Sequence, residues 1–303
     1  MKLSTLSVIL IPTFRRPVLL RKLLTSLHSE LLGKDVAIVV GDNDCGEEIP
    51  AIVEEYKTLF SSLTCIPVPD RGISQVRNAL VQHVVDYFPM WQYLIMLDDD
   101  GFVMPDWFSS LFETINKYPA EVYGGPVLGD IPQSSNIFAR NSLYVARSTK
   151  ATGYVDILSG AQNIVLSRSV EKYIDYPFFD MAYGLSGGED YAFFRRLRAK
   201  GARFVWSADA YLTEPTPVER LQVKKVLWRY YTTGKYMASI DRSFDGTWPT
   251  FFNAVKGFLG SLIKCLKNLF LIEKNEFASS VLMLAHFSGR LMGVTGSRST
   301  RYS

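Results

Sequence analysis

The chain has 303 residues, of which 48% are hydrophobic and 21% are charged, and its formal net charge is +3 at pH 7. This composition is typical of a globular protein and excludes disorder over most of the length. The small positive charge is far from the strongly basic balance of nucleic-acid-binding proteins, so we expect no nucleic-acid partner.

Three features of the sequence predict a chain that stays inside the cell. The apolar run at residues 6–11 is short and leads into Arg15-Arg16, which indicates a first β-strand rather than a signal peptide. No stretch reaches the roughly 18 charge-free apolar residues of a spanning helix. The three cysteines have no paired spacing, which favours reduced thiols. We therefore expect a cytoplasmic protein.

Up to about residue 128, short apolar runs alternate with longer amphipathic segments. The expected strands are residues 6–11, 36–41, 64–68 and 93–97, and the expected helices are residues 17–29, 47–60 and 74–87. This order predicts an α/β fold with a Rossmann-like, mostly parallel sheet flanked by helices. The turn after the first strand lacks a glycine-rich motif, so we expect no dinucleotide cofactor.

The second half predicts an irregular segment, a short return to regular structure and a helical C-terminal extension. Residues 129–160 are rich in turn-forming residues and predict loops with an irregular strand. Strands are expected at 162–166 and 203–206, and helices at 189–200, 218–237, 251–272 and 277–292. Pro215 and Pro217 predict a boundary between a first domain, residues 1–215, and a helical region, residues 216–303.

The strand at residues 93–97 ends in three consecutive carboxylates, Asp98, Asp99 and Asp100. Adjacent anions repel one another, and Mg²⁺ or Mn²⁺ is the usual compensation where a diphosphate also binds. Because side chains alternate along a strand, Asp98 and Asp100 can point to one side, one towards a ribose and one towards the metal. The alternative is a plain acidic turn before a helix near Pro105.

Polar residues also follow the first two predicted strands. In open α/β sheets, ligands bind beyond the carboxyl ends of the strands, where Pro12 and Thr13, Asp42 and Asp44, and the three consecutive carboxylates all fall. A carboxylate at Asp42 or Asp44 can accept hydrogen bonds from a nucleobase imide and from ribose hydroxyls. Separate turns would not predict one shared cleft.

Two arginines and a later acidic pair complete the candidate site. Arg71 and Arg77 stand at the start of the third predicted helix, where they can approach a base or a diphosphate, or else remain solvated surface charges. Glu189 and Asp190 follow two glycines at the front of a helix, where acidic residues ordinarily complement the helix dipole. The glycines also let the backbone approach a ligand, and Asp190 is suited to take a proton from an attacking hydroxyl.

Five motifs in this order resemble the inverting family 2 glycosyltransferases of GT-A fold. The motifs are Ile-Pro-Thr-Phe-Arg-Arg-Pro, Val-Val-Gly-Asp-Asn-Asp, Arg-Gly-Ile-Ser-Gln-Val-Arg-Asn, Leu-Asp-Asp-Asp and Gly-Gly-Glu-Asp. The resemblance covers roughly residues 5–210 and is greatest to bacterial enzymes that build exopolysaccharide or lipopolysaccharide repeat units. It implies an inverting transfer of one sugar from a nucleoside diphosphate sugar, with uridine diphosphate favoured, to an acceptor hydroxyl on a saccharide or lipid-linked saccharide.

The resemblance also implies roles for individual residues. Asp190 would be the general base with Glu189 beside it near the acceptor, and Asp100, with Asp98, would bind the metal. The implied nucleotide-sugar-binding residues are Pro12, Thr13, Arg15, Asp42, Asp44, Arg71, Arg77, Asp98 and Asp99. The turn Asp42-Asn43-Asp44-Cys45 departs from the D-D-G-S type that the family often shows, which leaves open which carboxylate meets the base. The Gln-x-x-Arg-Trp motif of processive members is absent, which favours single-sugar addition.

The C-terminal region predicts a membrane contact. Residues 251–272 combine a wide apolar face with Lys256, Lys264 and Lys267, as in helices that lie in a membrane interface. We therefore expect peripheral contact through residues 251–292 at the cytoplasmic face of the membrane. The alternative is that these helices pack against the catalytic domain or cover one another.

Two other functions remain open from the sequence. The pattern Asp98-x-Asp100-Gly101 after an apolar strand also resembles haloacid-dehalogenase-type phosphatases, although here the strand is the fourth and no G-D-x-x-x-D motif follows. A non-catalytic, membrane-associated scaffold is the second alternative.

Overall fold

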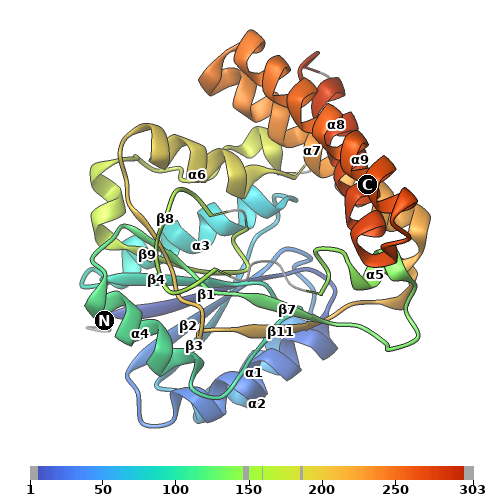
Figure 1. Cartoon of the computed structure of the whole chain (residues 1–303). Coiled ribbons are helices and arrows are strands. Elements are labelled where there is room, and N and C mark those ends of the chain that lie inside the picture. The colour runs from blue at the N-terminus through green and yellow to red at the C-terminus, as the bar shows by residue number, and fades with distance from the viewer. Residues whose placement is uncertain (1–5, 146–149, 159, 185–186, 297–303) are drawn as a thin grey trace. The chain divides into compact units, whose positions relative to one another are not determined.

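The computed structural model describes residues 6–145, 150–158, 160–184 and 187–296 (Figure 1). This part of the chain divides into two compact units. Unit 1 comprises residues 1–127, 148–184 and 192–214, and unit 2 comprises residues 128–147, 185–191 and 215–303. The last change from unit 1 to unit 2 along the chain is at Pro215. The division into domains 1–215 and 216–303 remains a prediction.

Within the described residues, unit 1 is built on an eight-stranded sheet of order β3-β2-β1-β4-β9-β6-β10-β8. The strands are β1 (Ser7–Thr13), β2 (Val36–Asp42), β3 (Ser62–Pro67), β4 (Tyr93–Leu97), β6 (Val122–Gly124), β8 (Gly153–Val155), β9 (Asn163–Ser167) and β10 (Phe204–Trp206). Strands β1 to β4 are parallel to one another, as are β6 and β10, whereas β9 is antiparallel to β4 and β6, and β8 is antiparallel to β10. A smaller sheet has the order β5-β11-β7, from β5 (Phe102–Val103), β11 (Leu212–Pro215) and β7 (Val127–Asp130).

The helices of unit 1 pack on hydrophobic side chains at both faces of the large sheet. They are α1 (Pro17–Leu31), α2 (Glu48–Tyr56), α3 (Ile73–Tyr87), α4 (Trp107–Lys117) and, from Ala192 onwards, α6 (Glu189–Ala199). Side chains of α3 and α6 join one buried cluster, and those of α1, α2 and α4 join the other. Strands β1 and β2 are buried along their whole length, which explains why they appear in the sequence as continuous apolar runs.

The predicted α/β fold, with a mostly parallel sheet flanked by helices, is confirmed, and several local details differ from the prediction. The helix expected at residues 47–60 ends at Tyr56 and is followed by a 3₁₀ turn, Lys57–Leu59. The helix expected at 218–237 begins with a 3₁₀ turn, Val218–Leu221, and only then continues as an α-helix. The short strands β5, β6 and β11 had no predicted counterpart, because runs this short carry little periodicity. The helix α4 begins close to Pro105, where the alternative of an acidic turn places a helix.

Unit 2 is helical. Besides most of β7 and the 3₁₀ turn Val218–Leu221, it contains α5 (Ile137–Arg140), α7 (Val223–Asp245), α8 (Thr247–Phe270), α9 (Lys274–Gly293) and the start of α6. Glycines let α9 approach its neighbours closely. A Cβ added to Gly289 would lie 1.9 Å from the carbonyl oxygen of Tyr231 in α7, and one added to Gly257 in α8 would lie 2.0 Å from the ring of Phe287. Across the described ranges, none of the helices combines the length and the apolar character that crossing a membrane requires.

Candidate functional site

The carboxyl ends of β1, β2 and β4 lie side by side at one edge of the sheet in unit 1. Strand β1 pairs with β2, where Thr13 stands opposite Asp42, and with β4 on its other side. The backbone N–H of Asn43 donates to the carbonyl oxygen of Thr13 at 3.0 Å. Pro12 is buried in β1 directly before this point. The register therefore brings the polar residues after these three strands to one place.

Asp99 connects the turn after β1 to the turn after β4. Its Oδ2 accepts a hydrogen bond from the hydroxyl of Thr13 at 2.7 Å, and its Oδ1 accepts one from Arg16 at 2.9 Å. The same Arg16 nitrogen donates to Oδ2 of Asp100 at 3.0 Å. Asp99 is only 4% exposed, so both of its oxygens are used within the protein. Asp99 therefore holds the turns after β1 and β4 together.

The pKa values of Asp99 and Arg16 follow from burial and from the neighbouring charges. Burial raises the pKa of Asp99 to about 6, with Asp100 adding to the rise and Arg16 and Thr13 opposing it. Burial alone would lower the pKa of Arg16, but the charges of Asp99 and Asp100 outweigh it and raise the pKa above its ordinary value. Arg16 therefore remains a cation and supplies the positive charge that adjacent carboxylates need.

Asp98 has a separate cationic partner. Its Oδ1 accepts a hydrogen bond from Arg77 of α3 at 2.9 Å. The Arg77 side chain is buried and its guanidinium lies 5.5 Å from the centre of the Phe179 ring, so it is no solvated surface charge. Arg71 precedes α3 and is exposed, with its guanidinium 4.4 Å from the centre of the Phe14 ring. The three carboxylates after β4 are thus divided between two arginines.

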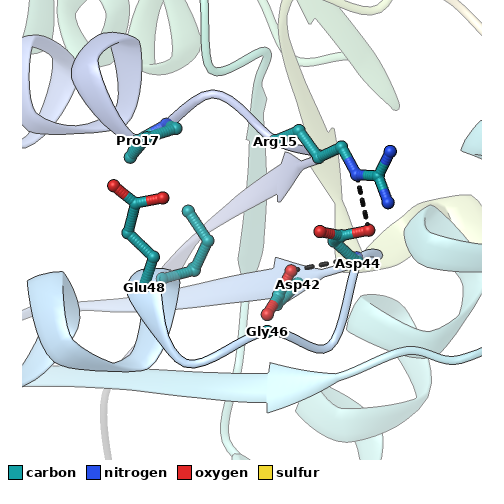
Figure 2. Close-up of a pocket in the computed structure, with 7 residues that line it drawn as sticks. Arg15, Pro17, Asp42, Asp44, Gly46 and Glu48 are labelled. Atoms are coloured by element: carbon teal, nitrogen blue, oxygen red, sulfur yellow. Dashed lines mark hydrogen bonds and ion pairs between the residues drawn. The ribbon is translucent and has the colours of Figure 1, made fainter.

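A pocket of about 300 Å³ lies beside the turn after β2 (Figure 2). It is lined by Arg15, Pro17, Asp42, Asp44, Gly46, Glu48 and Ile49. Figure 2 shows Arg15 and Asp44 joined across the top of this turn, where Arg15 Nε donates to Asp44 at 2.8 Å. Asp42 accepts a hydrogen bond from the backbone N–H of Asp44 through Oδ1 at 3.0 Å.

The other carboxylate oxygen of Asp42 is the unusual atom of this pocket. Asp42 is 1% exposed, and among the described residues its Oδ2 has no hydrogen-bond partner. A buried carboxylate oxygen without a donor carries the full cost of its lost hydration, so native proteins usually pair such an atom with a side chain, a water or a ligand. The pocket therefore has a ready acceptor for an N–H or O–H group of a bound molecule.

Sequence reasoning missed two residues that shape this site. Arg16 was quoted within a motif but given no role, although it pairs with both Asp99 and Asp100. Asn43 fixes the turn after β2, because its amide donates to the carbonyls of Val68 and Asp70 and its Oδ1 accepts from the N–H of Gly72. The only available signal was their place inside motifs that also hold charged residues.

The predicted acidic pair begins α6 and belongs to unit 2. Glu189 is 7% exposed, whereas Asp190 is only partly buried. Gly188 precedes them with φ of +93°, and a Cβ there would lie 2.7 Å from the Tyr236 ring. Only glycine combines this backbone conformation with such a close approach. The first turn of α6 is therefore packed closely against α7.

A buried hydrogen-bonded chain also holds the first turn of α6. The hydroxyl of Tyr191, the residue after Asp190, donates to Oδ1 of Asp241 in α7 at 2.7 Å. Arg290 of α9 donates to Oδ2 of the same carboxylate at 2.6 Å. Both oxygens of the buried Asp241 thus connect α6 to α9, which makes the start of α6 part of the helical unit.

The described residues hold no group of three or more His, Cys, Asp and Glu side chains arranged to bind a metal ion by themselves. A cation that binds through one or two carboxylates and the phosphates of a substrate does not need such a group. Asp98 and Asp100 have the oxygen donors for this mode, and both are partly exposed, with side chains 26% and 17% accessible.

Similarity to a curated protein extends over nearly the whole chain. Succinoglycan biosynthesis protein ExoM of Rhizobium meliloti (strain 1021) is 25% identical over 297 residues, which is 93% of this chain and 91% of that protein.

Solved structures of two proteins share the fold and confirm the predicted GT-A fold. S. aureus TarS 1–349 in complex with UDP-GlcNAc has a TM-score of 0.54 and 15% identity over 92% of this chain and 90% of that chain. Against a longer TarS chain, the similarity covers 77% of this chain and 39% of the other. The mannosyltransferase PcManGT from Pyrobaculum calidifontis, in complex with GDP-Man and Mn²⁺, has a TM-score of 0.58 and 11% identity over 93% of this chain and 86% of that chain.

A family model described as "Glycosyl transferase family 2" matches residues 8–171, which is more than half of the chain. The matched segment contains the turns after β1, β2 and β4 and the carboxylates that follow them. The phosphatase and scaffold alternatives lose their support accordingly. The chain belongs to glycosyl transferase family 2 and is a glycosyltransferase.

Proposed function

We propose that this enzyme transfers one sugar from a uridine diphosphate sugar to an acceptor hydroxyl, with inversion at the anomeric carbon. Family membership supports the sugar transfer. The observation that carries the nucleotide part is Oδ2 of Asp42, a buried acceptor without a donor among the described residues, in the wall of a pocket.

The orphan oxygen of Asp42 suits a nucleobase that offers an N–H group. Uracil has an imide N–H between two carbonyls, and a carboxylate accepts such a hydrogen bond with the added strength of its charge. Guanine also offers N–H groups to a carboxylate. The two solved relatives hold UDP-GlcNAc and GDP-Man, which supports a base of this kind. We favour uridine because of the motif resemblance.

Cationic side chains are available for the diphosphate. Arg71 is exposed and stacked on Phe14, so its guanidinium can contact phosphate oxygens. Arg77 is already paired with Asp98 and acts by holding that carboxylate in place. Thr13 and Asp99 act in the same way, because they use their polar atoms on each other.

Asp100, with Asp98, would hold a divalent cation, Mg²⁺ or Mn²⁺, together with the diphosphate of the donor. The structure of PcManGT with Mn²⁺ supports this proposal. When bound, the cation neutralises charge on the leaving diphosphate as a Lewis acid. Arg16 already offsets part of the carboxylate charge through its ion pair with Asp100.

Asp190 would be the general base. Its carboxylate takes the proton of the acceptor hydroxyl as that oxygen forms a bond to the anomeric carbon. The bond between the anomeric carbon and the diphosphate breaks in the same step, so one displacement inverts the configuration. Asp190 is the better candidate than Glu189 because it is the less buried of the two. Glu189 remains beside it, near the acceptor.

The acceptor would be a saccharide, with a lipid-linked saccharide favoured, in surface polysaccharide biosynthesis. The similarity to a succinoglycan biosynthesis protein supports a polysaccharide product. Residues 1–215 would form the catalytic domain and residues 216–303 a helical region that serves the acceptor side. The missing Gln-x-x-Arg-Trp motif supports the addition of a single sugar.

The experiment is a panel of uridine, guanosine and thymidine diphosphate sugars, each incubated with the full chain and Mg²⁺, Mn²⁺ or a chelator. We expect slow hydrolysis of one uridine diphosphate sugar in the presence of metal, and loss of that hydrolysis with the chelator. Transfer to a simple saccharide then allows the anomeric configuration of the product to be read by NMR. Retention of configuration would refute the single displacement, and exclusive use of a guanosine diphosphate sugar would refute the assigned base.

A further inference from the structure

Helix α8 has a row of large apolar side chains that is exposed to solvent. Its members are Trp248, Phe252, Leu259, Ile263, Leu266 and Phe270, with exposed fractions of 69%, 63%, 51%, 66%, 59% and 88%. At about 100° per residue, all six fall within roughly 60° of the helix circumference. We call this row the α8 stripe. Exposure of several aligned large side chains is uncommon in a soluble protein and marks an interaction surface.

The α8 stripe plays no part in holding unit 2 together. The buried residues of α8 are Thr250, Ala254 and Ser261, which lie on another side of the helix. That side approaches α9, where Gly257 faces Phe287 and the amide of Asn268 donates to the hydroxyl of Ser280. The helix expected at residues 277–292, which is α9, therefore packs on α8 without covering the stripe.

The charges of α8 indicate what kind of surface would cover the stripe. Lys256, Lys264 and Lys267 are all exposed, and residues 247–270 contain no Asp or Glu. On a helical projection, Lys256 and Lys267 flank the stripe along one edge. At the N-terminal end of the stripe, the rings of Trp248 and Phe252 are stacked with centroids 6.2 Å apart. Aromatic rings and lysines around an apolar stripe are the features of helices that lie in the headgroup region of anionic membranes.

A second copy of the chain would fit this surface less well. In a two-fold symmetric dimer, the same lysines from both copies would meet at the rim of the stripe, and α8 offers no carboxylate to balance them. An anionic lipid surface supplies both the apolar layer and the negative charge.

We propose that α8 is a membrane-docking element that lies flat in the surface of an anionic bilayer, with the α8 stripe inserted among the acyl chains and Lys256 and Lys267 at the headgroups. This inference goes beyond the proposed function and needs no nucleotide or metal. Its test therefore stands or fails apart from the assignment of the donor.

The test is sedimentation of the full chain with vesicles of phosphatidylcholine alone or of phosphatidylcholine with phosphatidylglycerol, without sugar nucleotide. We expect binding to the anionic vesicles, weaker binding as NaCl rises, and little binding to the neutral ones. Ile263→Asn should lower the partition into anionic vesicles at least about tenfold, because a large apolar side chain is lost from the inserted row. Leu32→Asn, which changes a side chain 74% exposed in unit 1, should leave binding unchanged.

Tryptophan fluorescence gives a second readout that does not depend on the Ile263 variant. Trp248 in the α8 stripe and Trp228 in α7 are similarly exposed, at 69% and 61%. The emission should shift to the blue on addition of anionic vesicles, and Trp248→Phe should remove most of that shift while Trp228→Phe retains it.

Several results would overturn the proposal. Equal binding to neutral and anionic vesicles, no binding to either, or unchanged binding of Ile263→Asn would each do so. The chain could instead fail to bind vesicles and form a concentration-dependent dimer on gel filtration. If Ile263→Asn dissociates that dimer, the stripe is assigned to a second copy.

Discussion

The two units of this enzyme organise their polar groups differently. In unit 1, hydrogen bonds join residues from separate strand ends, such as Thr13, Arg16 and Asp99, and leave one buried oxygen of Asp42 for a ligand. In unit 2, the chain of Tyr191, Asp241 and Arg290 joins the first turn of α6 to two long helices. Under the proposed function, unit 1 recognises the donor and unit 2 holds the proton acceptor.

The largest expected effect comes from the proposed general base in unit 2. Asp190→Asn should lower kcat about 10²- to 10⁴-fold, because the amide cannot take the acceptor proton. The Kd of the donor, measured by titration calorimetry, should stay the same. Glu219→Gln removes the same charge from an exposed residue of the same unit and should alter neither kcat nor the Kd of the donor. A weaker donor affinity in Asp190→Asn would break the proposed division between the units.

In unit 1, Asp42→Asn should raise the Kd of the nucleoside diphosphate by about 10- to 100-fold. The variant keeps an oxygen for the backbone N–H of Asp44 but loses the charged acceptor in the wall of the pocket. Calorimetry with the free nucleotide measures this effect without turnover.

The matched variant Asp44→Asn sharpens the assignment, because Asp44 already pairs with the exposed Arg15. We expect a smaller loss of affinity from it. A larger loss would mean that Asp44, rather than Asp42, meets the base.

The packing of unit 2 can be disturbed by a substitution that replaces none of these polar residues. Gly289→Ala places a Cβ 1.9 Å from the carbonyl oxygen of Tyr231, so α7 and α9 must separate. The free energy of unfolding from urea titration should fall by about 1–3 kcal/mol. Gly260→Ala in α8, where a Cβ would meet nothing within 4 Å, should be neutral or slightly stabilising. Donor affinity should be unchanged in both variants.

The smallest expected effect is a pH dependence of stability that originates in unit 2. Burial, with the nearby charge of Arg290, lowers the pKa of His286 from 6.5 to about 4. A folded-state pKa below the unfolded value means that the stabilising contribution is present above pH 6.5 and is lost as the pH falls towards 4. Between pH 7.5 and 5.5 the loss should be about 1 kcal/mol.

Urea titrations of His286→Gln at the two pH values check this prediction. The variant should lose about that much of the pH dependence, while His28→Gln in unit 1 should retain the wild-type slope. An unchanged slope in His286→Gln would contradict the assignment to unit 2.

Much of unit 1 could be predicted because its signals are local. The strands β1, β2 and β4 are continuous apolar runs, and the aspartates that follow them mark where each run ends. The direction of β9 could not be predicted, since an apolar run has the same pattern whether its strand is parallel or antiparallel. The pairing of Arg16 with Asp99 was equally inaccessible, because it joins residues 83 positions apart.

The site and the C-terminal helices show the same limit. The carboxylates after β2 and β4 were identified from their positions, but which oxygens are already satisfied depends on side chains from other loops. The amphipathic pattern of α8 was visible in the sequence, whereas the exposure of its apolar side depends on how α9 packs. The sequence pattern of one helix does not show which of its side chains the other helices leave exposed.

The buried carboxylate of Asp241 has a consequence for the choice of acceptor. Because it fastens the start of α6 to α7 and α9, the proposed general base, Asp190, and the proposed membrane-docking helix, α8, belong to the same compact unit. With α8 seated in a bilayer, Asp190 would stand at a set height above the lipid. The enzyme would then select an acceptor hydroxyl by its distance from the membrane surface, because only a hydroxyl that the carrier lipid presents at that height would reach Asp190.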